Sequence, residues 1–161
     1  MNTYQLEDAL GFLVSMAGRS LSNSVQRTFT ENGFDATTEH WTVLVQLWNR
    51  NGLTQLELAE RTGRDQASMS RLIRNMLNRE LIDRKKDPRD GRCKRIYLTI
   101  KGKEQQKKLM DLVQQTLEEA TAGIPEEDVA TTKRVLKEIA YRNIATNKVF
   151  QNLDGKKGAD E

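Results

Sequence analysis

The chain has 161 residues, 30% of them charged and 37% hydrophobic, a balance typical of one folded soluble domain. Its one cysteine excludes an internal disulfide framework, and one cysteine with one histidine cannot complete a structural zinc site. Residues 64–101 carry a net charge of +7 and the rest of the chain −4, which predicts a localised anionic partner, either nucleic acid or a membrane surface.

Residues 4–30 are predicted to form one long helix. Apolar side chains recur along it at a spacing of three or four, at Leu10, Val14, Ala17, Leu21, Val25 and Phe29. Its first half is apolar on a second face as well, through Leu6, Phe12, Leu13 and Met16. A helix that is apolar on two sides needs two partners, which we expect to be its own domain and a second subunit.

The longest apolar run, at residues 9–18, is about half as long as a membrane span. Glu7 and Asp8 precede it, where a signal peptide would carry positive charge. We therefore expect a cytoplasmic protein without a membrane partner.

A second helix is predicted at residues 38–50, with Thr37 as its N-cap. Its buried stripe is expected to consist of Trp41, Leu44, Val45 and Trp48. His40 is the only histidine and lies three residues after Thr37. We interpret it as part of the helix start rather than as a catalytic or metal-binding group.

Two shorter helices follow at about residues 55–62 and 66–80. Thr54 and Glu57 have the spacing of a capping box, and Gly63 is placed to end the first of them. Asp65 can cap the second, whose inward stripe is predicted to contain Met69, Leu72, Ile73, Met76 and Leu77.

Residues 81–85 and 94–98 are predicted to pair as strands around Asp-Pro and Asp-Gly turns. Thr99 can cap a further helix at about 100–121, which Gly123 and Pro125 interrupt before a last helix that begins at Glu126. Residues 151–161 have too little apolar surface to fold and are expected to be a disordered tail.

The predicted elements follow one another in the order short capped helix, glycine turn, polar-faced helix and basic hairpin. This order is that of a helix-turn-helix with a wing. The predicted fold is therefore all-α with a small β-hairpin wing. The helix that starts near Asp65 is expected to enter the major groove of double-stranded DNA. Its predicted contact residues are Gln66, Ala67, Ser68, Ser70, Arg71 and Arg74.

The wing is expected to add contacts along the same duplex. Arg89 and Arg92 lie beside its turn and are the candidates for the minor groove, whose negative potential attracts arginine. The other predicted wing residues are Arg84, Lys85, Asp87, Lys94 and Arg95. Thr54, Gln55 and Arg64 are expected to contact the DNA backbone.

Residues 4–145 resemble the MarR family of bacterial transcription regulators. The resemblance is carried by TTEHWTVLVQL, LTQLELAERTG, SMSRLIRNMLNRELIDR and DPRDGRCKRIYLT, of which the last fits the D-x-R-x-x-R wing pattern through Asp87, Arg89 and Arg92. One departure is Glu80, which stands where the family usually has a glycine that ends the recognition helix. A left-handed cap there would cost a non-glycine residue about 1 kcal/mol.

The resemblance implies a homodimer that binds a pseudo-palindromic operator, most often as a repressor. Residues 1–36 and 100–150 would form the helical dimerisation region and residues 37–99 the DNA-binding region. Two half-sites would then be separated by about 10 base pairs. The resemblance also suggests release by a small phenolic or lipophilic acid, with Phe12, Met16, Arg19 and Trp41 as candidate ligand contacts.

Three other functions compete with this one. A non-specific architectural or nucleoid protein would bind operator and random duplex equally, because phosphate contacts carry no sequence information. A winged-helix protein-interaction module would carry an apolar recognition face. No catalytic residue, cofactor or metal is expected, since no phosphate-binding loop, nucleophile elbow or paired ligand motif is present.

Cys93 lies between cations that could lower its pKa and favour oxidation.

Overall fold

The computed structural model describes residues 5–145. The order of elements is η1 (Leu6–Asp8), α1 (Leu10–Glu31), α2 (Thr38–Asn49), β1 (Leu53–Thr54), α3 (Gln55–Thr62), α4 (Gln66–Asn78), β2 (Ile82–Lys86), β3 (Lys94–Leu98), α5 (Ile100–Ala120) and α6 (Glu126–Ala145). The tail predicted at residues 151–161 lies outside the described residues. None of the helices in the described part is long and apolar enough to span a membrane.

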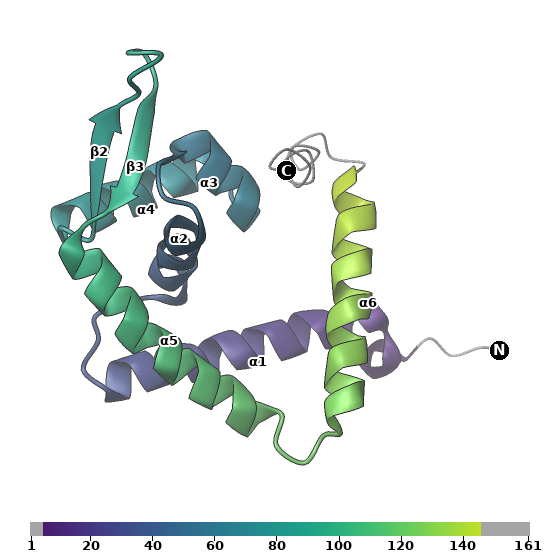
Figure 1. The fold of residues 1–161 in the computed structure, drawn as a ribbon. Coiled ribbons are helices and arrows are strands. Elements are labelled where there is room, and N and C mark those ends of the chain that lie inside the picture. Colours follow the sequence, from purple (N-terminus) through teal and green to yellow (C-terminus); the bar gives the residue numbers. More distant parts are fainter. Residues whose placement is uncertain (1–4, 146–161) are drawn as a thin grey trace, which may run out of the picture.

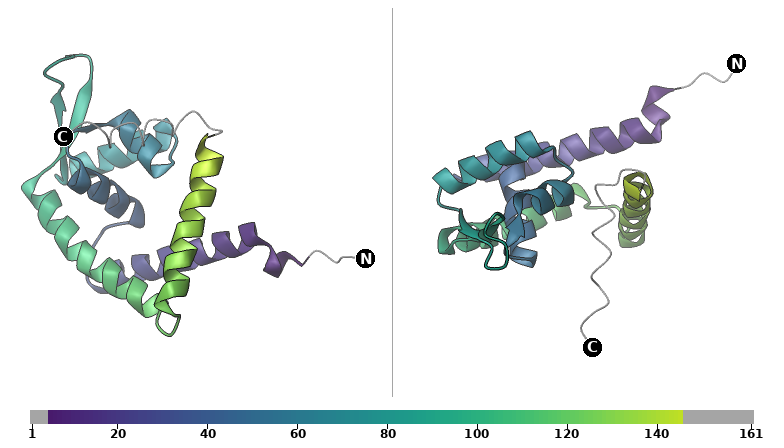
Figure 2. Two further views of the ribbon diagram at one scale, coloured as in Figure 1. Left: turned by 45° about the vertical axis from the view of Figure 1, so that its right-hand side comes forward. Right: turned by 90° about the horizontal axis from the view of Figure 1, so that it is seen from above.

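Helices α2, α3 and α4 pack beside a small antiparallel sheet and form the winged module (Figure 1). α5 leaves the base of the sheet and crosses the C-terminal half of α1 (Figure 1). In two further views, the N-terminal half of α1 extends away from the winged module, and α6 stands apart from it (Figure 2). The predicted fold class, mainly helical with a hairpin wing, is confirmed.

The sheet has three strands, in the order β1-β3-β2, where the sequence predicted two. β2 and β3 pair as expected, from Ile82 opposite Leu98 to Lys86 opposite Lys94. The missed strand β1 has only two residues, which lie opposite Ile96 and Arg95 of β3. This pairing attaches the start of α3 to the inner edge of the wing.

The capping residues predicted for α3, α4 and α5 are confirmed. Thr54 and Glu57 form a capping box at α3, and Gly63 ends that helix with φ of +65°. Asp65 accepts a hydrogen bond from the Ser68 N–H at 2.8 Å, and Thr99 caps α5 through the Gly102 N–H at 3.0 Å.

The first helix is shorter than predicted. The chain makes a single 3-10 turn at Leu6–Asp8, and Ala9 then adopts an extended conformation before α1 begins. No side-chain hydrogen bond caps the N-terminus of α1 at Ala9. The helix therefore begins at Leu10 without the local stabilisation that a capping residue supplies.

The buried face of α2 differs from the predicted stripe by one position. His40, Val43, Leu44 and Leu47 are buried, whereas Trp48 is 42% exposed. Trp41 is only partly buried against the core, and the ring of Trp48 lies under the Lys107 ammonium group at 5.8 Å. The prediction was wrong because α2 contacts α3, α4, α5 and β3, and these neighbours bury a wider and rotated face.

Much of the apolar surface of α1 and α6 has no partner within the described chain. In α1 only Val25 and Phe29 are buried, while Leu10 is 60% and Val14 41% exposed. The expected second apolar face is exposed too, with Met16 at 47%. No residue of α6 whose side chain is described is buried.

Glu80 ends the recognition helix in the left-handed conformation that the sequence indicated, with φ of +59°. The Leu81 N–H donates to the Met76 carbonyl oxygen at 3.1 Å, which closes the end of α4. The Thr99 hydroxyl donates to the Glu80 carbonyl at 2.6 Å and so holds the start of α5 against this turn.

Candidate nucleic-acid interface

Helix α4 is amphipathic, and its core contacts decide which side chains reach solvent. Met69, Ile73 and Met76 are fully buried. The opposite face exposes Gln66, Ala67, Arg71, Arg74, Asn75 and Asn78, while Ser68 and Ser70 are half-buried at its margins. The six predicted recognition residues therefore lie on the outer side of α4 or on its edges.

The first turn of α4 is held in place by its own side chains. Because the Asp65 carboxylate accepts hydrogen bonds from Ser68, its pKa is lowered and the cap remains ionised at neutral pH. The Arg71 guanidinium donates to the Ser68 hydroxyl at 3.3 Å. This bond orients Arg71 toward the N-terminal end of α4, where base contacts are expected.

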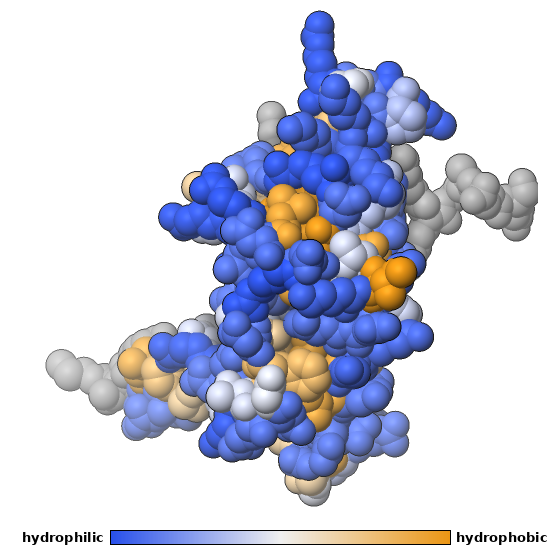
Figure 3. Space-filling model, turned by 90° about the vertical axis from the view of Figure 1, so that its left-hand side faces the viewer, coloured by the Kyte–Doolittle hydropathy of each residue, from blue (hydrophilic) through white to orange (hydrophobic). Residues whose placement is uncertain are grey.

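The wing extends from the winged module beside α4 as a two-stranded finger (Figure 1). Its exposed cations are Arg84, Lys85, Lys86, Arg89, Arg92 and Lys94. Lys86 was not among the predicted contacts, although the basic run around it gave the signal. The face of the molecule seen from the wing side is mostly hydrophilic, with small apolar areas (Figure 3).

Asp87 differs from the other predicted wing residues because it is buried, with 7% of its surface exposed. Its Oδ1 accepts the Arg89 N–H at 2.7 Å, and its Oδ2 forms an ion pair with Arg95 Nε. The bond from the Arg89 N–H and the adjacent Arg95 lower the pKa of Asp87. Asp87 therefore shapes the wing loop, and its carboxylate is not presented to DNA as the sequence prediction assumed.

Arg95 is also committed within the protein. Its guanidinium donates to the Gly52 carbonyl at 2.8 Å and lies 4.0 Å from the Glu57 carboxylate. Hydrogen bonding to Asp87 raises the pKa of Arg95. Since Glu57 is part of the α3 capping box, Arg95 joins the wing to the start of α3. With 34% of its side chain exposed, its predicted contact with DNA stays a prediction beside this internal role.

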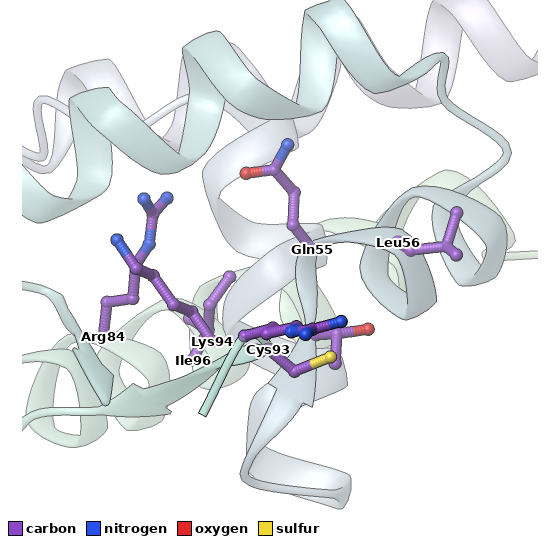
Figure 4. Close-up of a pocket in the computed structure, with 8 residues that line it drawn as sticks. Gln55, Leu56, Arg84, Cys93, Lys94 and Ile96 are labelled. Carbon is purple, nitrogen blue, oxygen red and sulfur yellow. The ribbon is translucent and has the colours of Figure 1, made fainter. Parts of the chain in front are cut away.

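A hollow of about 300 Å³ lies between the start of α3 and the base of the wing (Figure 4). Its lining includes the cations Arg84, Arg92 and Lys94, and the N-terminal residues of α3, Thr54 and Gln55. In Figure 4 the Gln55 amide and the Arg84 guanidinium extend in the same direction. The structure thus brings two of the predicted backbone contacts beside three of the predicted wing contacts.

Cys93 lines the same hollow, but its environment opposes reactivity. The thiol lies 3.5 Å from the Asp90 carboxylate. Hydrogen bonding to Asp90, and the negative charge of that carboxylate, raise the pKa of Cys93. The expectation that the flanking cations lower this pKa is therefore wrong.

Arg64, the third predicted backbone contact, forms an ion pair with Glu39 at 3.3 Å. The two side chains border a polar hollow of about 460 Å³ between α1 and α2, together with Ser22, Asn23, Gln26, Thr38 and Thr42. The pKa of Glu39 is lowered, first by its hydrogen bond to Thr37 and further by Arg64.

The four candidate ligand residues do not line either of these two hollows. Phe12, Met16 and Arg19 belong to the part of α1 that extends away from the winged module, whereas Trp41 packs against the core. Sequence reasoning also missed a contact between α2 and α4, in which His40 Nε2 lies 2.9 Å from Asn75 Oδ1.

The winged module matches a known family. The sequence model described as "MarR family" matches residues 37–94, which include α2, α3, α4, β2 and the turn of the wing. The HTH-type transcriptional regulator TcaR of Staphylococcus aureus (strain Newman) is 29% identical over 114 residues, which cover 70% of this chain and 75% of TcaR.

Two solved structures share the fold. CouR from Rhodococcus jostii RHA1, bound to p-coumaroyl-CoA, is 26% identical with a TM-score of 0.76, over 86% of this chain and 96% of CouR. A MarR-family transcriptional regulator from Rhodococcus sp. RHA1 is also 26% identical, with a TM-score of 0.78, over 86% of this chain and 99% of that one. Its winged helix-turn-helix fold, the family model that matches its winged module and these relatives together show that the chain belongs to the MarR family of transcriptional regulators.

Proposed function

We propose that this regulator acts as a homodimer in the cytoplasm, on the nucleoid, and represses transcription by binding a pseudo-palindromic operator. One observation carries the proposal: α4 exposes polar and basic side chains on the face away from the core, next to a wing with six exposed cations. α4 supplies side chains that distinguish bases, and the wing supplies charge that binds the backbone and minor groove.

The exposed apolar surfaces of α1 and α6 support the homodimer. Leu10, Leu13 and Val14 of α1, and Val135 and Leu136 of α6, are each between 38% and 60% exposed. Such faces are stable in water when a second subunit covers them. A two-fold dimer presents two copies of α4, which requires half-sites about 10 base pairs apart.

Release by a small molecule is the further part of the proposal. The crystal structure of CouR, which is 26% identical, has p-coumaroyl-CoA bound. We propose a phenolic or lipophilic acid as effector for this chain. Phe12, Met16, Arg19 and Trp41 stay predicted contacts, which would need the second subunit to complete a pocket.

Selection of bound duplexes from a random pool at physiological salt tests the proposal. A palindromic consensus is the expected result, because two copies of α4 would read equivalent half-sites. Repeating the binding assay with candidate phenolic acids tests release.

Equal affinity for the selected duplex and for random sequence would contradict operator recognition. It would instead support the architectural protein, whose binding relies on phosphate contacts alone.

A further inference from the structure

His40 is buried at the start of α2 and bonds in two directions. Its Nδ1 lies 3.0 Å from the Thr37 backbone nitrogen, within the capping box of α2. Its Nε2 lies 2.9 Å from the amide oxygen of Asn75, 35 residues further along the chain on the exposed side of α4. One ring therefore joins the N-terminus of α2 to the helix that faces DNA.

The partners of His40 fix where its proton lies. A backbone N–H can only donate, so Nδ1 must accept from Thr37 and the neutral ring carries its proton on Nε2. Nε2–H then donates to Asn75, which requires the amide oxygen, and not the amide nitrogen, to face His40. The Thr37 N–H therefore determines which ring nitrogen of His40 carries the proton, and this proton determines the orientation of the Asn75 amide.

The Asn75 amide nitrogen has no partner among the described residues, and Asn75 is exposed. Asn75 lies one turn after Arg71 on the same side of α4, so its two free N–H groups extend the row of donors that begins with Arg71. A second contact holds the same two segments together, because Arg79 of α4 forms an ion pair of 2.7 Å with Asp35.

We propose that His40 is a positioning residue for DNA recognition: as a neutral imidazole it holds α4 against the start of α2 and turns the N–H groups of Asn75 toward the DNA. This inference rests on the proposed function, since it assumes that α4 lies against a duplex. The ligand class for Asn75 is an acceptor, either a phosphate oxygen or an acceptor atom on a base edge.

The inference predicts a pH dependence. The pKa of His40 is lowered, mainly because the ring is buried. The hydrogen bond that His40 makes to Asn75 acts in the opposite direction and raises this pKa. The charged groups around the ring are Arg79, which lowers this pKa, and Glu39 and Asp35, which raise it. The contribution of neutral His40 is thus complete above its unfolded pKa of about 6.5 and is lost as the pH falls toward the lower folded value. Protonation places an N–H on Nδ1, opposite the Thr37 N–H.

His40→Gln separates the two bonds of His40. A glutamine at this position can complete the capping box with Thr37 through its amide oxygen, but its flexible side chain does not fix an N–H donor at the position of the imidazole Nε2. We expect His40→Gln to melt like the wild type and to bind the selected duplex about threefold to tenfold more weakly at neutral pH. Asn75→Ala should weaken binding at least as much.

The control is Gln114→Ala. It removes an exposed amide from α5, outside the winged module, and no side-chain hydrogen bond of Gln114 is present among the described residues. We expect its affinity to stay within about twofold of the wild type.

The pH profile distinguishes a positioning role from mere stability. His40 is the only histidine, so it is the only side chain whose ordinary pKa lies between about 5.5 and 7.5. Wild-type affinity should fall only when the pH drops below about 6.5, because burial keeps the His40 ring of the folded protein neutral down to its lowered pKa, although an added positive charge alone would strengthen DNA binding. His40→Gln should show no such fall.

Nitrogen-15 NMR of the free wild-type chain gives a measurement that does not involve DNA. We expect a neutral ring protonated on Nε2 at neutral pH. A proton on Nδ1, or wild-type affinity and pH profile in both His40→Gln and Asn75→Ala, would overturn the inference. If the wild type bound no duplex, the proposed function would fail instead, and the NMR result would still decide the link between α2 and α4.

Discussion

Asp87 and Arg95 form an ion pair at the loop end of the two wing strands. Further contacts of Arg95 connect this pair to the start of α3. Asp87 accepts the N–H of Arg89 on one side, and Arg95 reaches the Gly52 carbonyl and the Glu57 carboxylate on the other. The two most widely connected residues of the wing are therefore those whose charged groups bind other parts of the protein. Their role is to fix the direction in which the exposed arginines point.

Replacing Asp87 with alanine should weaken DNA binding by about tenfold, because the wing loop loses its acceptor for Arg89 and its partner for Arg95. The sign is informative, since removal of a negative charge near a polyanion would by itself tighten binding. Fluorescence anisotropy with the selected duplex measures the affinity, and amide hydrogen exchange of residues 87–93 measures the loop.

Asp83→Ala is the control for this change. Asp83 is an exposed carboxylate on β2, 3.9 Å from Lys85, and its loss should leave affinity unchanged or slightly higher. Tighter binding by both variants would show that Asp87 acts only through its charge.

Arg89→Ala should reduce operator affinity and make the dependence of log affinity on log salt shallower by about one unit. Arg89 is exposed beside the wing turn, and its guanidinium has no ion-pair partner within the described residues. Titrations at several salt concentrations measure both effects. Arg142→Ala on α6, whose side chain pairs with Glu138, should change neither quantity. An unaltered salt slope in Arg89→Ala would argue against the minor-groove contact.

Leu13→Asp should convert the proposed dimer into monomers, because it places a charge in the exposed apolar surface of α1, where Leu13 is 40% exposed. Operator affinity should fall with it, since each half-site would bind alone. Sedimentation velocity measures the mass. Ser15→Asp adds the same charge on a polar side of α1 and should leave the dimer intact. A wild-type chain that sediments as a monomer would refute the proposed assembly.

Glu80→Gly should stabilise the chain by about 1 kcal/mol, because Glu80 has φ of +59° and glycine adopts this conformation without steric cost. The exposed ion pair of Glu80 with Lys101, at 3.7 Å, offsets little of this gain. Urea unfolding measures the free energy.

The same substitution inside a helix should have the opposite sign. Glu104 is an exposed residue within α5, and Glu104→Gly should destabilise the chain by about 1 kcal/mol. Equal destabilisation by both variants would indicate that the turn at Glu80 is not strained.

The sequence alone determined the features that depend on neighbours three or four residues away. Thr54 with Glu57, Asp65 with Ser68, and Gly63 at its turn set the limits of α3 and α4 through local hydrogen bonds. The spacing of Met69, Ile73 and Met76 fixed the inward face of α4, and hence the residues left exposed to solvent. These could be predicted because the partners of each group are present in the same short segment.

Only the tertiary structure decided the features whose partners are distant in sequence. β1 exists because Leu53 meets Ile96, the buried face of α2 follows from the four elements around it, and Arg95 faces Gly52 across 43 residues. For the same reason Asp87 and Arg95 could not be distinguished from the other charged residues of the wing, and the contact of His40 with Asn75 left no pattern in the sequence. A charge pattern specifies that a surface is basic, but the packing of several segments selects which of its charges remain free.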